Sequence, residues 1–319
     1  MERVELRPLS LGELLDRTFA LYRNHFWLFV GIMAIPSSFS IPMNTFMLAM
    51  QNKPSPSGKA VSPGFIAGML AGYFVFFLVF ILVYAIATGA ATSAVSESYL
   101  GREATVRGSY GKVRGNFWRI IGVVLNIWLR FTGMLFLFMI VVVGVTLAIA
   151  GVPAPRNHMD PVLAGIFAIG IVLIYLVVFV LCFIIMLRYA VAIPALVLEG
   201  IGISAAIRRS VELTRGRRAQ IFVAFLLTAV IGYIGVAVFQ GPFFVALVLS
   251  AKHPQAMPWL TFLMSVSGAI GGSLTGPMLM IVLVLCYYDS RIRKEAFDLQ
   301  YMMTSLERPS PAPGTVSPV

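Results

Sequence analysis

Residues 202–222 read GISAAIRRSVELTRGRRAQIF, a short polar stretch between two long apolar runs. Apolar side chains recur at Ile203, Ile207 and Val211, a spacing that places them on one face of a helix. Arginines occupy the opposite face, and Gly216 stands where the C-terminus of a helix favours glycine. A helix of this kind lies in a membrane interface, with its arginines toward anionic headgroups. The stretch therefore predicts a membrane protein.

The composition agrees with a membrane location. Of the 319 residues, 59% are hydrophobic and 12% are charged, and the mean hydropathy is +0.90. A soluble domain carries about 25% charged residues. The net charge of +11 also fits a nucleic-acid-binding protein, but the cations flank apolar runs and no nucleic-acid-binding motif accompanies them. We therefore expect anionic membrane lipids as partners, and no nucleic acid.

Six apolar runs are each long enough to cross the hydrocarbon core of a bilayer, which takes about 20 helical residues. The fold class that follows is an all-α, polytopic membrane protein with six transmembrane helices. The expected spans are Phe26–Met50, Gly64–Ser98, Phe117–Ala150, Val162–Leu187, Ile221–Ser250 and Trp259–Tyr288.

The last span is followed by charged residues that predict a separate helix over Asp289–Met302. The end of the chain is rich in proline, which is typical of disordered segments. We therefore expect one membrane domain over residues 1–306 and a disordered tail over residues 307–319. Prolines interrupt the first span at Pro36 and Pro42 and leave two interpretations open, a simple kink or a broken, substrate-facing helix.

Lysine and arginine are distributed unevenly among the polar segments. The N-terminal segment, residues 99–119, residues 188–218 and the C-terminal segment together hold nineteen of them, whereas the three alternate loops hold four. Because cytoplasmic loops carry the excess of Lys and Arg, this asymmetry predicts that both termini and all four basic segments are cytoplasmic.

The spans also suggest a threefold repeat. Each unit would begin with a cytoplasmic amphipathic helix, opened by Ser10, Thr105 or Ser204, and continue with two spans joined by a short outer loop. The predicted architecture is therefore three hairpins, each preceded by such a helix. Residues 64–72 and 268–276 have the spacing Gly-x-x-x-Gly-x-x-x-Gly, which lets a neighbouring helix approach closely.

The candidate lipid-binding residues are the arginines of the central stretch, each worth about 1 kcal/mol near an anionic membrane surface. They are Arg208, Arg209, Arg215, Arg217 and Arg218.

Three polar residues within the spans are candidates for an intramembrane site, since such residues are costly in lipid. Arg130 lies thirteen residues into its span, roughly 20 Å deep if the helix enters the bilayer at its start. The following twenty apolar residues suffice to span by themselves, so Arg130 also fits the membrane boundary. Asn126 and Gln240 are more often contacts between helices than ligands.

Catalytic and metal-binding patterns are missing from the sequence. No two carboxylates fall within one span, and there is no His-Glu-x-x-His motif or phosphate-binding loop. Cys182 and Cys286 both lie in apolar runs, as small buried hydrophobic residues do. We therefore expect no catalytic residue, no metal and no cofactor.

Three junctions of the chain resemble a bacterial membrane family. They are LDRTFALYRNHFWLFV at residues 15–30, RYAVAIPALVLEG with AAIRRSVELTRGRR at residues 188–218, and YYDSRIRKEAFDLQ at residues 287–300. The family is the multi-pass membrane domain named after glycerophosphoryl diester phosphodiesterases. In this resemblance the pieces Arg209-Ser210-x-x-Leu213 and Asp289-x-Arg291 are the most specific.

The resemblance implies a module of the bacterial plasma membrane that precedes a hydrolase in some family members. A hydrolase barrel takes roughly 250 residues, so we expect none in the short tail of this chain. Our first hypothesis is a non-enzymatic membrane scaffold or accessory subunit that contacts anionic lipid. Further partners open to it are other membrane proteins and its own copies. The alternative is a transporter or lipid-handling permease with a path along the proline-interrupted helices, and a membrane enzyme is a third class.

Overall fold

The computed structural model describes residues 7–51, 63–150, 161–250, 257–296 and 303, and no strand occurs among them. It confirms the all-helical fold class. Six helical stretches in this part of the chain have the length and apolar composition of membrane spans. They are Phe26–Phe46, Gly64–Tyr99, Phe117–Gly144, Val172–Glu199, Arg218–Leu249 and Met257–Glu295.

Eleven helices make up the described part of the chain. They are α1 (Leu11–Asn24), α2 (Phe26–Ser38), α3 (Ser40–Gln51), α4 (Pro63–Tyr99), α5 (Val106–Arg114), α6 (Phe117–Ala150), α7 (Pro161–Arg188), α8 (Ala192–Glu199), α9 (Ile203–Thr214), α10 (Arg218–Leu249) and α11 (Met257–Glu295).

The bounds of the spans differ from the predicted ones by a few residues or more, and the first and the sixth span also differ in how they are built. The first span is divided at Phe39 into α2 and α3, whereas Pro242 lies inside a continuous α10. The sixth span does not end at Tyr288, because α11 continues to Glu295, so the separate helix predicted from Asp289 is wrong in its start. Its remainder and the tail over residues 307–319 lie outside the described residues.

Local capping explains where two of the short helices begin. The Ser10 hydroxyl accepts a hydrogen bond from the backbone N–H of Glu13, and the Glu13 carboxylate accepts one from the backbone N–H of Ser10. Thr105 caps α5 in the same way. The prediction for Ser204 is wrong, because the N-cap of α9 is Gly202, two residues earlier, and it makes no side-chain bond.

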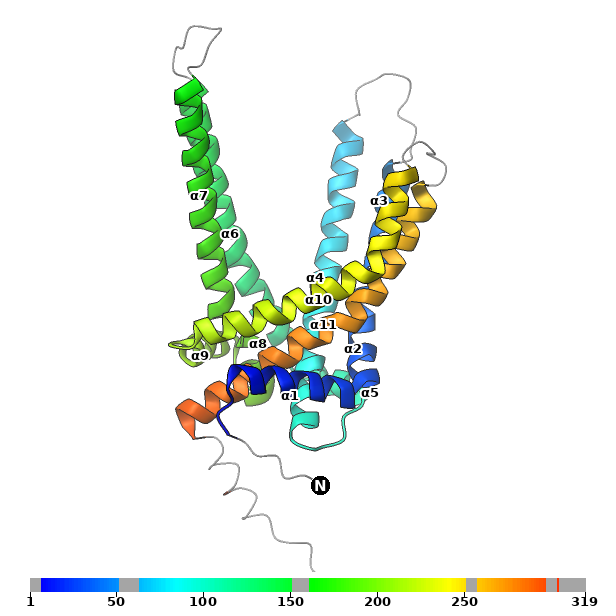
Figure 1. Cartoon of the computed structure of the whole chain (residues 1–319), viewed down its shortest axis with the longest axis vertical. Coiled ribbons are helices and arrows are strands. Elements are labelled where there is room, and N and C mark those ends of the chain that lie inside the picture. Colours follow the sequence, from blue (N-terminus) through cyan, green and yellow to red (C-terminus); the bar gives the residue numbers. More distant parts are fainter. Residues whose placement is uncertain (1–6, 52–62, 151–160, 251–256, 297–302, 304–319) are drawn as a thin grey trace, which may run out of the picture.

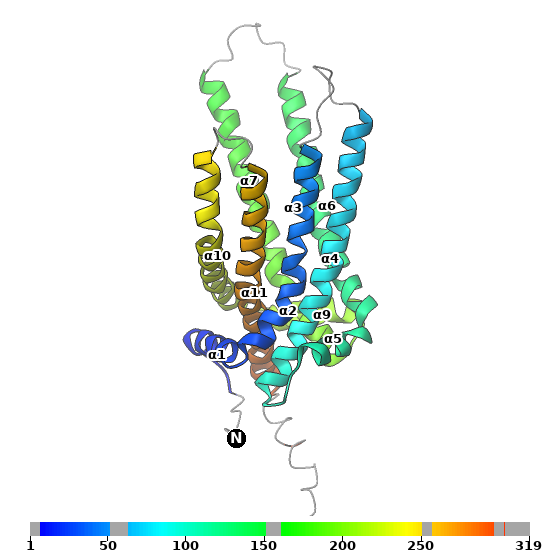
Figure 2. The same cartoon turned by 90° about the vertical axis from the view of Figure 1, so that its right-hand side faces the viewer.

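The helices form two arms that diverge from a common base (Figure 1). One arm consists of α6 and α7, and the other of α3, the outer part of α4 and the outer ends of α10 and α11. We call the end where the arms meet the base; α1, α5, α8 and α9 lie there, together with the adjoining ends of α4, α10 and α11 (Figures 1 and 2).

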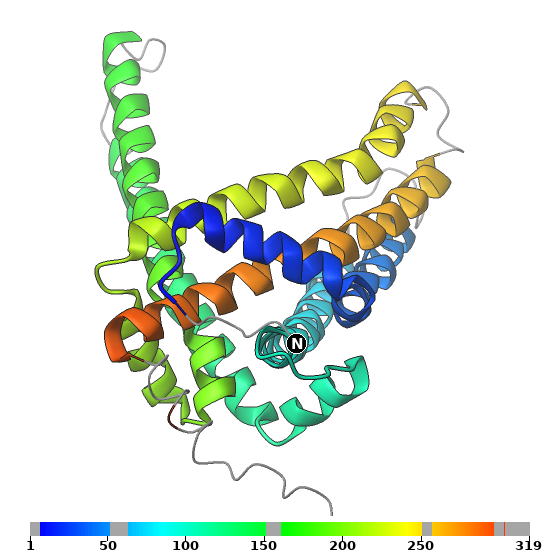
Figure 3. The same cartoon turned by 60° about the horizontal axis from the view of Figure 1, so that its bottom comes forward.

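The buried core lies in the base. Figure 3 shows α11 running through this end of the molecule, where it packs against α1, α8, α9 and α10. Its residues from Ile281 to Ile292 are mostly buried, as are the small residues of α4 from Ala85 to Ser98. A Cβ atom on Gly89 would lie 2.7 Å from Ile120 Cδ1, so this glycine allows α6 to approach α4 closely.

Beyond the base the helices expose apolar side chains. On α4 the exposed large hydrophobic residues run from Ile66 to Tyr84, and on α7 from Ile169 to Met186. Eighteen helical steps on α4 cover about 27 Å. The hydrocarbon core of a bilayer is about 30 Å thick. These bands therefore have the length of the hydrocarbon core, and the tightly packed base adjoins their inner ends.

Candidate functional site in the base

Asp289 is the most deeply buried charged side chain of the base. It is 2% exposed, and its Oδ1 accepts a hydrogen bond from the backbone N–H of Leu9 at 2.8 Å. Arg217 lies 2.6 Å from Oδ2, and Arg293 lies 3.0 Å from Oδ1. Burial lowers the pKa of Arg217, while the Asp289 carboxylate opposes that shift. One carboxylate thereby joins the N-terminal segment, the start of α10 and the end of α11.

A second ionic cluster joins α8, α9 and α11. Arg209 of α9 lies 3.1 Å from Glu199 and 2.5 Å from Glu295, and Tyr287 donates a hydrogen bond to Glu199 at 2.8 Å. Burial opposes the charge of Arg209, but its hydrogen bonds to the two glutamates raise its pKa above the usual value. Arg291 completes the cluster through Glu295.

Helix α9 is also tied to the end of α7. The hydroxyl groups of Ser210 and Thr214 both donate to the backbone oxygen of Arg188, at 3.0 and 3.4 Å. These bonds satisfy a carbonyl that the end of a helix leaves without a partner. Ser210, in the specific Arg209-Ser210-x-x-Leu213 piece, therefore connects α9 to the α6 and α7 arm.

The five arginines predicted to contact lipid divide into two groups. Arg208 and Arg215 are exposed, and their side chains have no hydrogen-bond or ion-pair partner in the described part of the chain. Arg209 and Arg217 are occupied by the carboxylates described above. Arg218 is half-buried, and its Nε has no hydrogen-bond partner among the described residues.

The three intramembrane candidates lie apart from one another. Arg130 donates a hydrogen bond to the hydroxyl of Tyr189, directly after the end of α7. Gln240 packs against Gly268, where a Cβ atom would meet its Nε2. The Oδ1 atom of Asn126 is buried and has no partner among the described residues.

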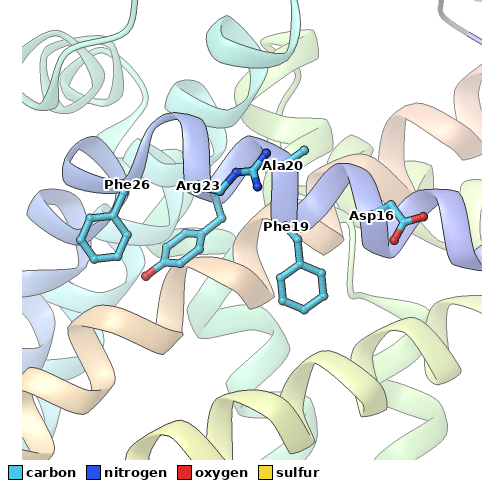
Figure 4. A pocket seen from close by; sticks show the side chains of 6 residues that line it. Asp16, Phe19, Ala20, Arg23 and Phe26 are labelled. Atoms are coloured by element: carbon cyan, nitrogen blue, oxygen red, sulfur yellow. The ribbon is translucent and has the colours of Figure 1, made fainter.

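A groove lies beside α1 (Figure 4). It has a volume of about 440 Å³ and is lined by Asp16, Phe19, Ala20, Tyr22, Arg23 and Phe26. Phe19 projects from α1 into this groove and is 40% exposed. Tyr22 donates a hydrogen bond to the backbone oxygen of Leu274, which holds this end of α1 against α11. The groove therefore combines aromatic surface with the charged side chains of Asp16 and Arg23.

A second cavity of about 350 Å³ lies among α4, α5, α8 and α11, and its walls carry several charged and hydroxyl-bearing side chains. A third, of about 300 Å³, lies among α2, α3 and α11 and is almost wholly apolar. No group of three or more His, Cys, Asp or Glu side chains with the geometry of a metal site occurs among the described residues.

Comparison with known proteins gives one match, which covers the part of the chain that builds most of this base. Residues 166–305 match the membrane domain of glycerophosphoryl diester phosphodiesterase. The resemblance expected from the junction sequences is confirmed for these residues. No curated protein and no solved structure matches the chain. Three residues from the specific pieces of the resemblance, Arg209, Asp289 and Arg291, take part in the two ionic clusters, and Ser210 bonds to the end of α7.

The sequence does not reveal the partners in these clusters, because Glu199, Asp289 and Glu295 meet their arginines through contacts between segments far apart in the chain. Nor does it name the neighbours of the polar residues at the end of α4. One signal was available: Ser93, Ser96 and Ser98 recur in a helix otherwise made of alanines and apolar residues. Polar side chains so close together on a buried helix indicate a packed polar interface.

Proposed function

We propose that this chain is a non-enzymatic scaffold or accessory subunit of the bacterial plasma membrane, with both termini and the base on the cytoplasmic side. Its six spans would form three hairpins, each preceded by an amphipathic helix at the membrane interface. In this proposal the base rests against the inner surface of the bilayer and holds anionic lipid headgroups. No metal, cofactor or catalytic residue takes part.

The observation that carries the proposal is that the side chains of Arg208 and Arg215 are unoccupied. Both side chains are exposed and lack partners among the described residues, although two neighbouring arginines are neutralised by carboxylates. Helix α9 is held rigidly through Ser210 and Arg209, so the two free guanidinium groups are presented from a fixed surface. A fixed pair of cations next to a membrane attracts anionic headgroups.

Two of the five predicted lipid-contact arginines already have partners within the protein. Arg209 and Arg217 act within the protein, so we assign the main lipid contact to Arg208 and Arg215, with Arg218 beside them. The permease alternative requires a polar cavity at mid-membrane that Asn126, Arg130 or Gln240 would line. The three cavities described above are lined by other residues.

Replacing both exposed arginines, Arg208→Gln with Arg215→Gln, is expected to weaken binding of phosphatidylglycerol. Two headgroup contacts of about 1 kcal/mol each correspond to roughly 30-fold in affinity at low salt. Native mass spectrometry of the full chain, exchanged into phosphatidylcholine with a small fraction of phosphatidylglycerol, measures the retained anionic lipid.

The charge-matched control is Arg107→Gln with Arg114→Gln, which removes two exposed cations from α5. It should retain most of the phosphatidylglycerol. Equal loss in both double variants would mean that the attraction is diffuse, and unchanged retention in the α9 variant would remove the lipid-contact part of the proposal.

A further inference from the structure

The cavity among α4, α5, α8 and α11 has the properties of a binding site for a small anion. Its volume of about 350 Å³ is within the range of small-molecule sites, about 300 to 1,000 Å³. Four helices far apart in the sequence contribute to it, and three cations line it against one carboxylate. The polar side chains that line the cavity include Ser93, Ser96, Glu97, Arg102, Lys112 and Tyr288.

The cations of this cavity are exposed on one side and less exposed on the other. Lys112 and Arg102 lie 3.1 and 3.7 Å from Glu97, and their side chains are 55% and 45% exposed. Ion pairs this exposed are weak, so either cation can turn to an incoming anion at little cost. Arg291, on the opposite wall, is held by Glu295 at 3.1 Å.

Ser93 supplies the observation that points to a ligand. The residue is 6% exposed and lines the cavity, yet its hydroxyl has no hydrogen-bond partner in the described part of the chain. Its neighbour Ser96 instead shares a hydrogen bond of 2.7 Å with Tyr288. The Ser93 hydroxyl therefore borders the cavity as a donor that no described residue occupies, and it can bond to a ligand oxygen there.

The position of the cavity indicates where its ligand comes from. Exposed apolar residues on α4 end at Tyr84, and Ser93 lies nine residues further, about 14 Å along the helix. Leu100, at the far edge of the cavity, is about 24 Å beyond Tyr84. Along α4 the cavity therefore lies beyond the end of the exposed apolar band, on the side where a water-soluble ligand can enter.

We propose that this cavity binds the phosphate monoester group of a water-soluble metabolite. Lys112 and Arg102 bind the phosphate oxygens from the open side, and the Ser93 hydroxyl donates to a phosphate oxygen from α4. A tetrahedral group with three charged oxygens suits donors that approach from several walls, and a monoester carries close to two negative charges at neutral pH. This site is separate from the lipid-contact arginines of α9.

The test uses the purified full chain in a neutral detergent, with inorganic phosphate and phenyl phosphate as probes at constant ionic strength. Binding is followed by isothermal titration calorimetry. Lys112→Gln with Arg102→Gln is expected to weaken the affinity for phenyl phosphate at least tenfold, because two charge-assisted hydrogen bonds are lost. Ser93→Ala is expected to weaken it about fivefold, since it removes one neutral hydrogen bond and leaves the ion pairs intact.

Arg107→Gln with Arg114→Gln is the matched control, because these α5 cations do not line the cavity, and it should bind within about twofold of the parent chain. If the Lys112 and Arg102 variant does not fold, the affinity of the Ser93→Ala variant for phenyl phosphate still tests the proposal. No saturable binding by the parent chain, or equal loss in the control, would overturn the proposal.

A second arm separates the two sources of a phosphate monoester. The same variants are compared in phosphatidylcholine nanodiscs that contain phosphatidate, whose headgroup is also a monoester. We expect phosphatidate binding to be unaffected by Ser93→Ala and phenyl phosphate not to displace the lipid. Loss of phosphatidate binding in Ser93→Ala would show that the cavity takes a lipid headgroup and overturn the assignment to a soluble ligand. Loss of lipid binding in the α9 variant alone concerns the proposed function and leaves this site intact.

Discussion

Replacing Asp289 with alanine should lower the free energy of unfolding by about 3 to 5 kcal/mol, the usual cost of leaving a buried ionic partner unpaired. The carboxylate is 2% exposed and lies 2.6 Å from Arg217, whose own side chain is 13% exposed. Without it, the largely buried Arg217 guanidinium, Arg293 and the N–H of Leu9 all lose this carboxylate. Unfolding of the full chain in a neutral detergent, followed by circular dichroism, measures the change.

Glu103→Ala is the matched control for Asp289→Ala. It removes the same charge from an exposed position in the segment between α4 and α5, and it should change the free energy of unfolding by less than about 0.5 kcal/mol. A further variant, Arg217→Gln, should be destabilising as well, but it should cost little more when Asp289 is already absent, because the two residues share one interaction. Full additivity of the two substitutions would contradict the pairing.

Gly271→Leu should destabilise the chain by about 3 kcal/mol through overpacking between α10 and α11. A Cβ atom at Gly271 would lie 3.2 Å from the backbone Cα of Val236 and 3.5 Å from Phe239 Cβ. Backbone atoms cannot turn away as a long side chain can, so the two helices would have to separate. The measurement is again the unfolding midpoint in neutral detergent.

Gly133→Leu provides the comparison for Gly271→Leu. Gly133 is an exposed residue of α6, and a Cβ atom there would meet nothing within 4 Å. Its substitution should be neutral or slightly stabilising, because leucine favours the helix more than glycine does. Equal destabilisation at both positions would indicate a general effect of glycine replacement, and not a close approach at Gly271.

The two glycine stripes, residues 64–72 and 268–276, show that Gly-x-x-x-Gly spacing predicts close helix packing only in part. The rule predicts close approach at residues 268–276, and the structure finds Gln240 against Gly268 and Ser37 against Gly272. The closest approach to a backbone atom is instead at Gly271, outside the stripe. At Gly64 and Gly68 a Cβ atom would meet nothing within 4 Å, so that stripe is no packing seam along most of its length. The spacing of small residues identifies one face of a helix, but it does not show whether or which helix packs against that face.

The sequence by itself determined the features that depend on local chemistry and on the bilayer. Six apolar runs of sufficient length predict six spans, because a backbone in hydrocarbon must satisfy its own hydrogen bonds as a helix. The Ser10 capping box and the Thr105 cap follow from residues three positions apart, and both are present. The amphipathic helix within residues 202–222 is likewise predicted from local sequence. The spacing of its apolar residues indicates a helix without any knowledge of which helices it contacts.

The tertiary structure decided which arginines are free. Along the chain Arg208 and Arg209 are adjacent and equivalent, but Arg209 meets Glu199 and Glu295, which come from α8 and α11. Asp289 likewise meets the backbone N–H of Leu9, 280 residues away in the sequence. Such pairings, and the cavity around Ser93, depend on how distant helices pack, because the interaction of two charges is set by their separation in space.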